Sequence, residues 1–314
     1  MSCAFVADYA RSVNVLIVGA EAAGARALRA VQAIHGATIT VVTQDESLAQ
    51  AARGLGVPVL PPRVAENSEL AEWIDLNDID ILLNVHSLHI LHPDVIQAPR
   101  IGSFNLHPGP LPRYAGLMAP SWALFNGESS HAVSLHWMDE GIDTGPIAYV
   151  SSFPISDRDT GLSVSARCVR EGIPLIVRLL DAAATRADSI PVVPQTMERR
   201  TYFGRQPPNG GCLIWNSGAR KLVDFVRACD YLPFRSPWGH PRARLGDSDI
   251  FILRAKRTFE SANLEPGTVG SLEEAGAMVA SRDEWIRLEL IEIGGESMPA
   301  GEALTPGDQL LDGA

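Results

Sequence analysis

Short β-branched runs alternate with longer helix-forming segments over the first 85 residues, and this alternation limits the possible folds more than any other feature of the chain. The runs lie at 13–19, 38–42, 57–60 and 79–85, and the predicted helices between them end near Gln32, Leu55 and Leu76. Strands that alternate with helices form a parallel sheet with helices on both faces. The sequence therefore predicts an α/β domain whose ligands gather at the carboxyl ends of the strands.

The turn after the first predicted strand, Gly19 to Gly24, has the spacing of a dinucleotide-binding G-x-G-x-x-G loop with its middle glycine replaced. A plain strand-to-helix turn accounts for the same residues. A nicotinamide oxidoreductase is an alternative that requires this loop to bind a pyrophosphate.

The chain changes character after a long predicted helix that begins at Thr160. Residues 191–209 are proline-rich, and a helix at 219–228 follows them. Short strands separated by glycine and proline come next, at 249–253, 267–270, 277–280 and 286–293. Such strands indicate a small open, OB-like β-barrel. We predict a Rossmann-like catalytic domain at 1–190, a linker at 191–209 and a substrate-associated β-barrel domain at 210–314.

The stretch from Phe104 to Pro112 carries the candidate chemistry. Asn105 and His107 are two residues apart at the end of an apolar run, so on a strand both side chains point to the same face. Three prolines and a glycine then impose a stiff turn. An amide beside an imidazole suits acyl chemistry, which needs a donor to a developing oxyanion and a group that moves protons. Asp143, after a later apolar segment, offers a carboxylate that could orient the imidazole.

These residues carry a family resemblance. Asn105-x-His107-Pro108, Leu111-Pro112, Gly116 and Asp143-Thr144-Gly145 occur in this order, and together they resemble the motifs of the folate-dependent formyltransferases. That family includes glycinamide ribonucleotide formyltransferase, methionyl-tRNA formyltransferase and the sugar N-formyltransferases. The resemblance implies that Asn105, His107 and Asp143 are catalytic and that 10-formyltetrahydrofolate is the co-substrate. Gly109 departs from the pattern, because many members have serine there.

The resemblance also implies a folate-binding segment before the Asn-x-His motif. The residues of this segment are Ser87, Leu88, His89, Ile90 and Leu91. In the loop before Asp143, the residues that would face the same folate are Glu140, Gly141 and Ile142. We further predict that 88–91 begins a helix packed on the sheet. His86, His89 and His92 could suggest a metal, but they lie in a turn without a thiolate or a second set of carboxylates, so no metal is expected.

The predicted function is N-formyl transfer from 10-formyltetrahydrofolate to a primary amine of a small molecule, an amino sugar or an amino-acid-derived metabolite that could bear a phosphate or a nucleotide. Residues 36–62 have Arg53 as their only cation, where tRNA-formylating relatives carry a basic insertion. Residues 199–257 hold twelve Lys/Arg against four Asp/Glu, which would suit a phosphate-bearing substrate or a tRNA. Formylation of initiator tRNA and non-catalytic folate binding are the alternatives.

The predicted compartment rests on signals that are absent from the sequence. The net charge is −11, and no apolar run approaches the roughly 18–20 residues needed to span a bilayer. The N-terminus has no basic leader, and the four cysteines form no C-x-x-C pair. We therefore expect a cytoplasmic protein with free thiols and no membrane partner. The oligomeric state and the pathway stay open.

Overall fold

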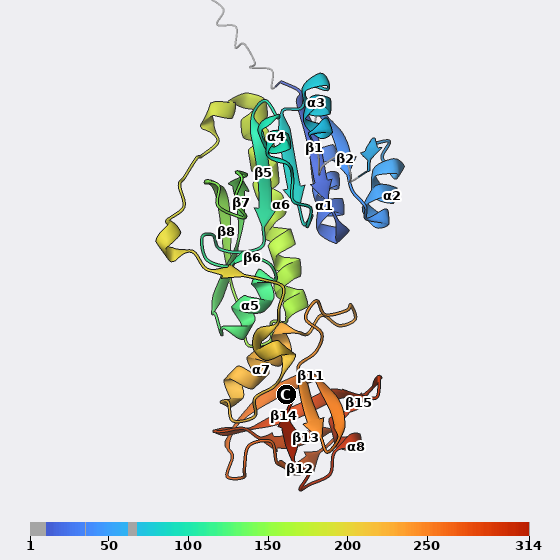
Figure 1. The fold of residues 1–314 in the computed structure, drawn as a ribbon, viewed down its shortest axis with the longest axis vertical. Coiled ribbons are helices and arrows are strands. Elements are labelled where there is room, and N and C mark those ends of the chain that lie inside the picture. The colour runs from blue at the N-terminus through green and yellow to red at the C-terminus, as the bar shows by residue number, and fades with distance from the viewer. Residues whose placement is uncertain (1–10, 35, 62–67, 314) are drawn as a thin grey trace, which may run out of the picture. The chain divides into compact units, whose positions relative to one another are not determined.

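The computed structural model describes residues 11–34, 36–61 and 68–313 (Figure 1). The chain divides into two compact units. Unit 1 comprises Met1–Gly116, Ala132–Phe153 and Arg167–Tyr202, and unit 2 comprises Leu117–His131, Pro154–Ala166 and Phe203–Ala314.

Unit 1 is built on a seven-stranded sheet with the order β3-β2-β1-β4-β5-β7-β8. In chain order the strands are β1 Val13–Gly19, β2 Ala37–Val42, β3 Val59–Leu60, β4 Ile81–Val85, β5 Gly102–His107, β7 Ser130–Trp137 and β8 Ile147–Pro154. The neighbours from β3 to β5 pair in parallel, which confirms the predicted parallel sheet, whereas β7 pairs antiparallel with β5. The order reverses between β1 and β4, where ligands of such sheets bind.

The helices that connect these strands follow the predicted alternation. They are α1 Glu21–Gln32, α2 Glu46–Gly54, α3 Glu69–Leu76 and α4 Pro93–Gln97, and the long α6 Gly161–Thr185 follows the last strand, β8. Both faces of β1 and β4 are covered, so their side chains are almost wholly buried. One core cluster joins Leu16 and Leu82 of the sheet to Leu70 and Ile74 of α3 and Val95 of α4. The sheet is therefore closely packed against α3 and α4 on this face.

The predicted helix at Leu88 is wrong. This segment has no helical structure, and α4 begins five residues later at Pro93. Proline favours the first helical position and holds the residue before it extended, as seen for His92 at φ −63° and ψ 143°. Leu88 and Ile90 are consequently 65% and 81% exposed, whereas Leu91 packs into the core.

Unit 2 contains the helices α5 Ala119–Phe125, α7 Ala219–Ala228 and the short α8 Ala300–Ala303. Its antiparallel sheet has the order β12-β13-β14-β11-β10-β16, and β15 also pairs with β14. The strands are β10 Arg242–Leu245, β11 Ser248–Ser261, β12 Val269–Glu273, β13 Gly276–Ala280, β14 Glu284–Ile293, β15 Glu296–Pro299 and β16 Leu310–Asp312. This sheet matches the predicted open barrel, although β11 is far longer than the predicted 249–253. β11 and β14 pair over most of their length, which explains why the strand continues beyond its apolar core.

Cys168, Cys212 and Cys229 are buried free thiols, and burial raises the pKa of Cys168 and Cys229. Cys3 and the N-terminal residues on which the predicted absence of a leader depends lie outside the described residues. Within the described ranges, no helix is both long and apolar enough to cross a bilayer.

Candidate active site

The carboxyl end of β5 brings the two predicted motif residues to one face of the sheet. The register of strand pairing then places residues of both neighbouring strands, β4 and β7, opposite these two residues. Asn105 lies opposite Asn84 of β4 and opposite His136 of β7, and His107 lies opposite Ser134. Directly opposed residues are close enough for their side chains to interact. Asn84 and His136 both form hydrogen bonds with Asn105.

Asp143 is the point on which these side chains converge. Its Oδ1 accepts a hydrogen bond from Nδ2 of Asn105 at 3.2 Å, and its Oδ2 lies 3.4 Å from Nδ1 of His107. Oδ2 also accepts the backbone N–H of Gly116 at 2.7 Å. Of the three residues that the family resemblance implies to be catalytic, Asp143 therefore contacts both of the others, although the three come from two separate segments.

Burial and charge set the protonation of this cluster. His107 and Asp143 are 3% and 8% exposed. Burial lowers the pKa of His107 below its usual value, with the Asp143 carboxylate opposing the shift. For Asp143, burial would raise the pKa, but the charge of His107 and hydrogen bonds from His136 and Gly116 outweigh it and lower the pKa to about 2. At neutral pH the site therefore holds an ionised Asp143 beside a neutral His107.

Hydrogen bonding determines which imidazole nitrogen of His107 can take up a proton. Its Nε2 lies 2.7 Å from the carbonyl oxygen of Tyr114, which can only accept, so Nε2 carries the proton of the neutral ring. The Nδ1 lone pair then faces Asp143. A proton added at Nδ1 completes an ion pair with that carboxylate, so His107 is arranged as a base whose charged form Asp143 stabilises.

The expected pH dependence follows from this arrangement. With neutral His107 as the predicted base, we expect kcat to rise with pH through the lowered pKa of His107 and to level off by neutral pH. Since the usual value is 6.5, the rise should be centred below that pH. A pH–rate profile of formyl transfer measures this, and a midpoint above pH 7 would contradict the assigned role.

Gly109 lies against the His107 ring. A Cβ placed on Gly109 would lie 2.6 Å from Nε2 of His107 and 3.0 Å from the Tyr114 carbonyl oxygen. The turn itself is held by Ser134, whose Oγ donates to the Gly109 carbonyl at 2.7 Å and accepts the N–H of Leu111 at 3.2 Å. Glycine at this position therefore matches the space that the imidazole leaves.

We expect Gly109→Ser to lower kcat by about 10- to 100-fold, because the new Cβ displaces the imidazole and a small misplacement of a reacting group costs rates of this order. The matched control is Gly54→Ser, since nothing lies within 4 Å of a Cβ at that position on α2. Steady-state kinetics with circular dichroism of both variants measures the effect. Equal activity of the two variants would show that the His107 ring tolerates the added carbon.

The loop that carries Asp143 is fastened from the segment predicted to be a linker. Asp143 has a left-handed backbone at φ +56°, which few non-glycine residues adopt. Nε2 of Gln195 donates to the carbonyl oxygens of Asp143 at 2.9 Å and of Gly145 at 2.7 Å. Arg200 donates to the carbonyl of Ile142 at 2.9 Å. Segment 191–209 thus positions a site residue from about fifty residues away.

Gln195→Leu keeps the side-chain volume but removes both N–H donors, so we expect the Asp143 loop to loosen and kcat to fall about tenfold. The Km for the folate should change less than kcat. Thr196→Ala, an exposed change on the same segment, serves as the control. Unchanged kcat in Gln195→Leu would show that the two carbonyl contacts do not hold the loop.

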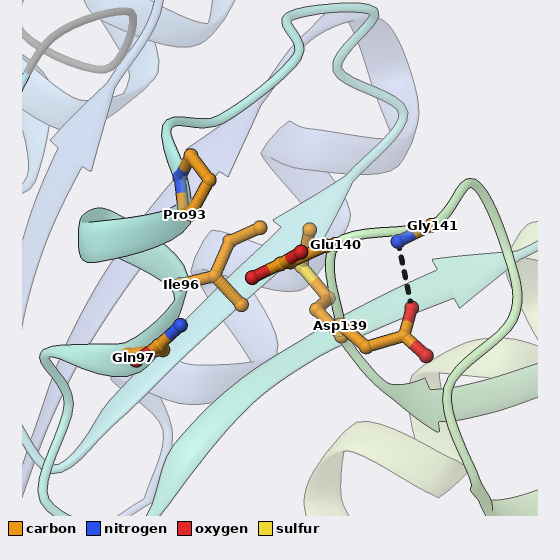
Figure 2. A pocket seen from close by; sticks show the side chains of 7 residues that line it. Pro93, Ile96, Gln97, Asp139, Glu140 and Gly141 are labelled. Carbon is orange, nitrogen blue, oxygen red and sulfur yellow. Dashed lines mark hydrogen bonds between the residues drawn. The ribbon is translucent and has the colours of Figure 1, made fainter.

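A pocket of about 490 Å³ opens beside this loop (Figure 2). Its lining, as formed by the described residues, is Pro93, Ile96, Gln97, Met138, Asp139, Glu140 and Gly141. Glu140 and Gly141 were predicted to bind folate, and they line this pocket. Ser87, Leu88, His89, Ile90, Leu91 and Ile142 were predicted with them and are not part of its lining. Leu88, Ile90 and Ile142 are instead exposed apolar side chains.

His136 is a site residue that none of the sequence motifs singled out. Its Nε2 lies 3.1 Å from Nδ2 of Asn105 and 3.5 Å from Oδ1 of Asp143. Its Nδ1 lies 2.6 Å from the Trp137 carbonyl oxygen, which can only accept, so Nδ1 carries a proton. The β5–β7 register is the signal that reveals it, and that register is a property of the tertiary fold.

Two of the three histidines considered as metal ligands lie beside nearby carboxylates. Nδ1 of His86 lies 3.1 Å from the carboxylate of Glu21. Nδ1 of His92 lies 3.4 Å from that of Asp94. Across the residues that the structure describes, no three His, Cys, Asp or Glu side chains are grouped as metal ligands. Glu21 is also the first residue of α1, so a carboxylate stands where a dinucleotide pyrophosphate would need to bind.

Comparison with known proteins identifies the family. The formyl transferase family model matches residues 47–180, and the model of the formyl transferase C-terminal domain matches residues 207–307. The chain is 30% identical to a methionyl-tRNA formyltransferase of Sorangium cellulosum, over 82% of this chain and 81% of that one. It is also 30% identical to the bifunctional polymyxin resistance protein ArnA of Wigglesworthia glossinidia brevipalpis, over 68% of this chain but only 31% of ArnA.

A solved structure shares the fold. The N-formyltransferase of Helicobacter canadensis, in complex with folinic acid and dTDP-3-aminofucose, superposes with a TM-score of 0.69 at 20% identity, covering 88% of this chain and 98% of that one. The match in sequence over most of a methionyl-tRNA formyltransferase, together with both domain models, shows that this chain belongs to the formyltransferase family of enzymes.

Proposed function

We propose that this enzyme transfers a formyl group from 10-formyltetrahydrofolate to the primary amine of a small molecule. The observation that carries the proposal is the contact of the half-buried Asn105 and the buried His107 with the buried Asp143. An amide donor, a base and a carboxylate that stabilises the protonated base are what acyl transfer to an amine requires.

The pocket at 93–97 and 138–141 fits the folate. Its volume of about 490 Å³ lies in the usual range for small-molecule sites. Pro93, Ile96 and Met138 offer apolar surface to a flat heteroaromatic ring, and Gln97 and Glu140 offer polar groups to its ring nitrogens (Figure 2). The folate supplies a formyl group already activated on a ring-linked nitrogen. The protein therefore has only to position the reacting groups and to stabilise the charge that develops during transfer.

Each site residue then has one task. Asn105 donates an N–H to the formyl oxygen as negative charge develops there. In this structure its Nδ2 is bonded to Asp143 and His136, so this donation exchanges one of those bonds. His107 takes the proton that the amine loses as its nitrogen bonds to the formyl carbon. Asp143 stabilises the resulting imidazolium, which can return the proton to the departing folate nitrogen.

Charge pairing favours a small acceptor over tRNA. Arg53, the single cation of 36–62, is paired with Glu46. Seven cations of the basic segment 199–257 lie within 4 Å of a carboxylate: Arg220, Arg227, Arg242, Arg244, Arg254, Lys256 and Arg257. Much of the charge that would face tRNA phosphates is thereby compensated. The nucleotide-linked amino sugar bound by the Helicobacter canadensis relative supports an amino sugar as the acceptor class.

Initiator tRNA is the second candidate, supported by the sequence match to a methionyl-tRNA formyltransferase. Tetrahydrofolate release can be followed with 10-formyltetrahydrofolate and either dTDP-3-aminofucose, a panel of amino acids and amino sugars, or charged initiator tRNA. We expect release with a small amine and weak dependence on salt. Release only with tRNA, falling steeply between about 50 and 200 mM salt, would favour tRNA instead. Binding of folinic acid, with no release of tetrahydrofolate in the presence of any acceptor, would indicate a non-catalytic folate-binding protein.

A further inference from the structure

Asn84 is a polar residue in a strand that otherwise has an apolar interior. It lies on β4, where Ile81, Leu82, Leu83 and Val85 are at most 1% exposed. Asn84 itself is 7% exposed. A side-chain amide in such a position costs stability unless its groups are hydrogen-bonded, so its presence calls for an explanation.

One end of the Asn84 amide is bonded to the proposed catalytic amide. Its Nδ2 donates to Oδ1 of Asn105 at 3.2 Å, across the register that pairs the two residues. Asn105 therefore directs its oxygen toward β4 and its nitrogen toward Asp143. The reverse orientation would oppose the Asn105 oxygen to the Asp143 carboxylate and two N–H groups to each other.

The other end of Asn84 is unsatisfied. Its Oδ1 is buried and has no hydrogen-bond partner among the residues that the structure describes. A buried polar atom of this kind destabilises the fold, and an apolar side chain of the same size would avoid the cost. Packing therefore does not account for asparagine at this position, whereas the bond to Asn105 does.

We propose that Asn84 is a positioning residue that fixes the orientation of the Asn105 amide, so that an Asn105 N–H faces the reacting carbonyl. The inference rests on the proposed formyl transfer, because it assigns Asn84 a role in that same site. The arrangement is a chain of contacts from Asn84 through Asn105 to Asp143, with His136 beside it. Loss of its first member leaves the Asn105 amide with one fewer constraint on its rotation.

Asn84→Leu separates this role from a structural one. We expect kcat to fall about 10- to 100-fold, the Km for 10-formyltetrahydrofolate to stay close to that of the parent, and Tm to be unchanged or higher. Asn84→Asp, which replaces the donor by a carboxylate facing Oδ1 of Asn105, should lower kcat further. The control is Thr40→Val, which removes a buried hydroxyl from β2 and should leave kcat unchanged. A lower Tm with unchanged kcat in Asn84→Leu would overturn the proposal.

A second measurement does not depend on the acceptor. The side-chain NH₂ signal of Asn105 can be assigned in ¹⁵N-labelled full-length protein from its absence in Asn105→Asp. We expect this signal to shift or broaden in Asn84→Leu and not in Thr40→Val. An unchanged Asn105 signal overturns the positioning role. Failure of the parent enzyme to release tetrahydrofolate with any amine overturns the proposed function and leaves this test standing.

Discussion

Replacing Asp143 with asparagine is expected to lower kcat by about 10³- to 10⁴-fold while the fold persists, the size of effect seen when a carboxylate that orients a catalytic histidine is neutralised. The carboxylate contacts Asn105 and His107 and accepts the backbone N–H of Gly116. Its charge also opposes the lowering of the His107 pKa by burial. The variant removes the charge and places an N–H donor among groups that are themselves donors.

Asparagine is the informative substitution because it tolerates the left-handed backbone of Asp143 at φ +56°. Loss of activity then reports charge and hydrogen bonding instead of backbone strain. Asp181→Asn, which removes an exposed carboxylate from α6, controls for net charge. Steady-state kinetics of both variants, with circular dichroism, measures the effect. An Asp143→Asn enzyme within tenfold of the parent would remove the carboxylate from the mechanism.

The same variant has an expected signature in acid. The pKa of Asp143 is lowered from 3.8 to about 2, so the ionised group stabilises the fold above its unfolded value and loses this contribution as pH falls from 3.8 toward 2. Asp143→Asn should therefore lose less stability over that window than the parent. Thermal unfolding between pH 5 and pH 2 measures the difference, and parallel curves would contradict the lowered pKa.

Asn105→Ala is expected to lower kcat by about 10²- to 10³-fold, as removal of a single oxyanion donor does in other acyl-transfer sites. The change also leaves Nδ2 of Asn84 without its acceptor and removes one donor from Asp143, so a modest fall in Tm should accompany it. The Km for the folate should change little, because Asn105 does not line the pocket at 93–97 and 138–141.

Gln50→Ala is the matched control for Asn105→Ala, since it removes an exposed amide on α2 that donates to Glu46 of the same helix. Asn105→Asp tests whether this position needs a neutral donor. It places a second carboxylate beside Asp143 and should abolish transfer as well. Retention of normal kcat by Asn105→Ala, with Tm lowered, would reduce Asn105 to a structural link between β4 and β5.

The sequence alone determined the features that depend on short-range physics. The alternation of β-branched runs and helix-forming segments specifies the parallel sheet, because strand and helix periods are local properties. The two-residue spacing of Asn105 and His107 places them on one face of β5 for the same reason. The prediction of a helix at Leu88 was wrong for a reason that is also local, because Pro93 determines where α4 begins.

Only the tertiary structure decided which other side chains surround that pair. Asn84 and His136 join Asn105 through the pairing of β5 with β4 and β7, and strand register is set by the packing of the whole sheet. Gln195 reaches the Asp143 loop from a proline-rich segment that carries no periodic signal. Contacts between segments far apart in sequence are chosen by the burial and hydrogen bonding of the complete fold, and so they cannot be derived from local spacing.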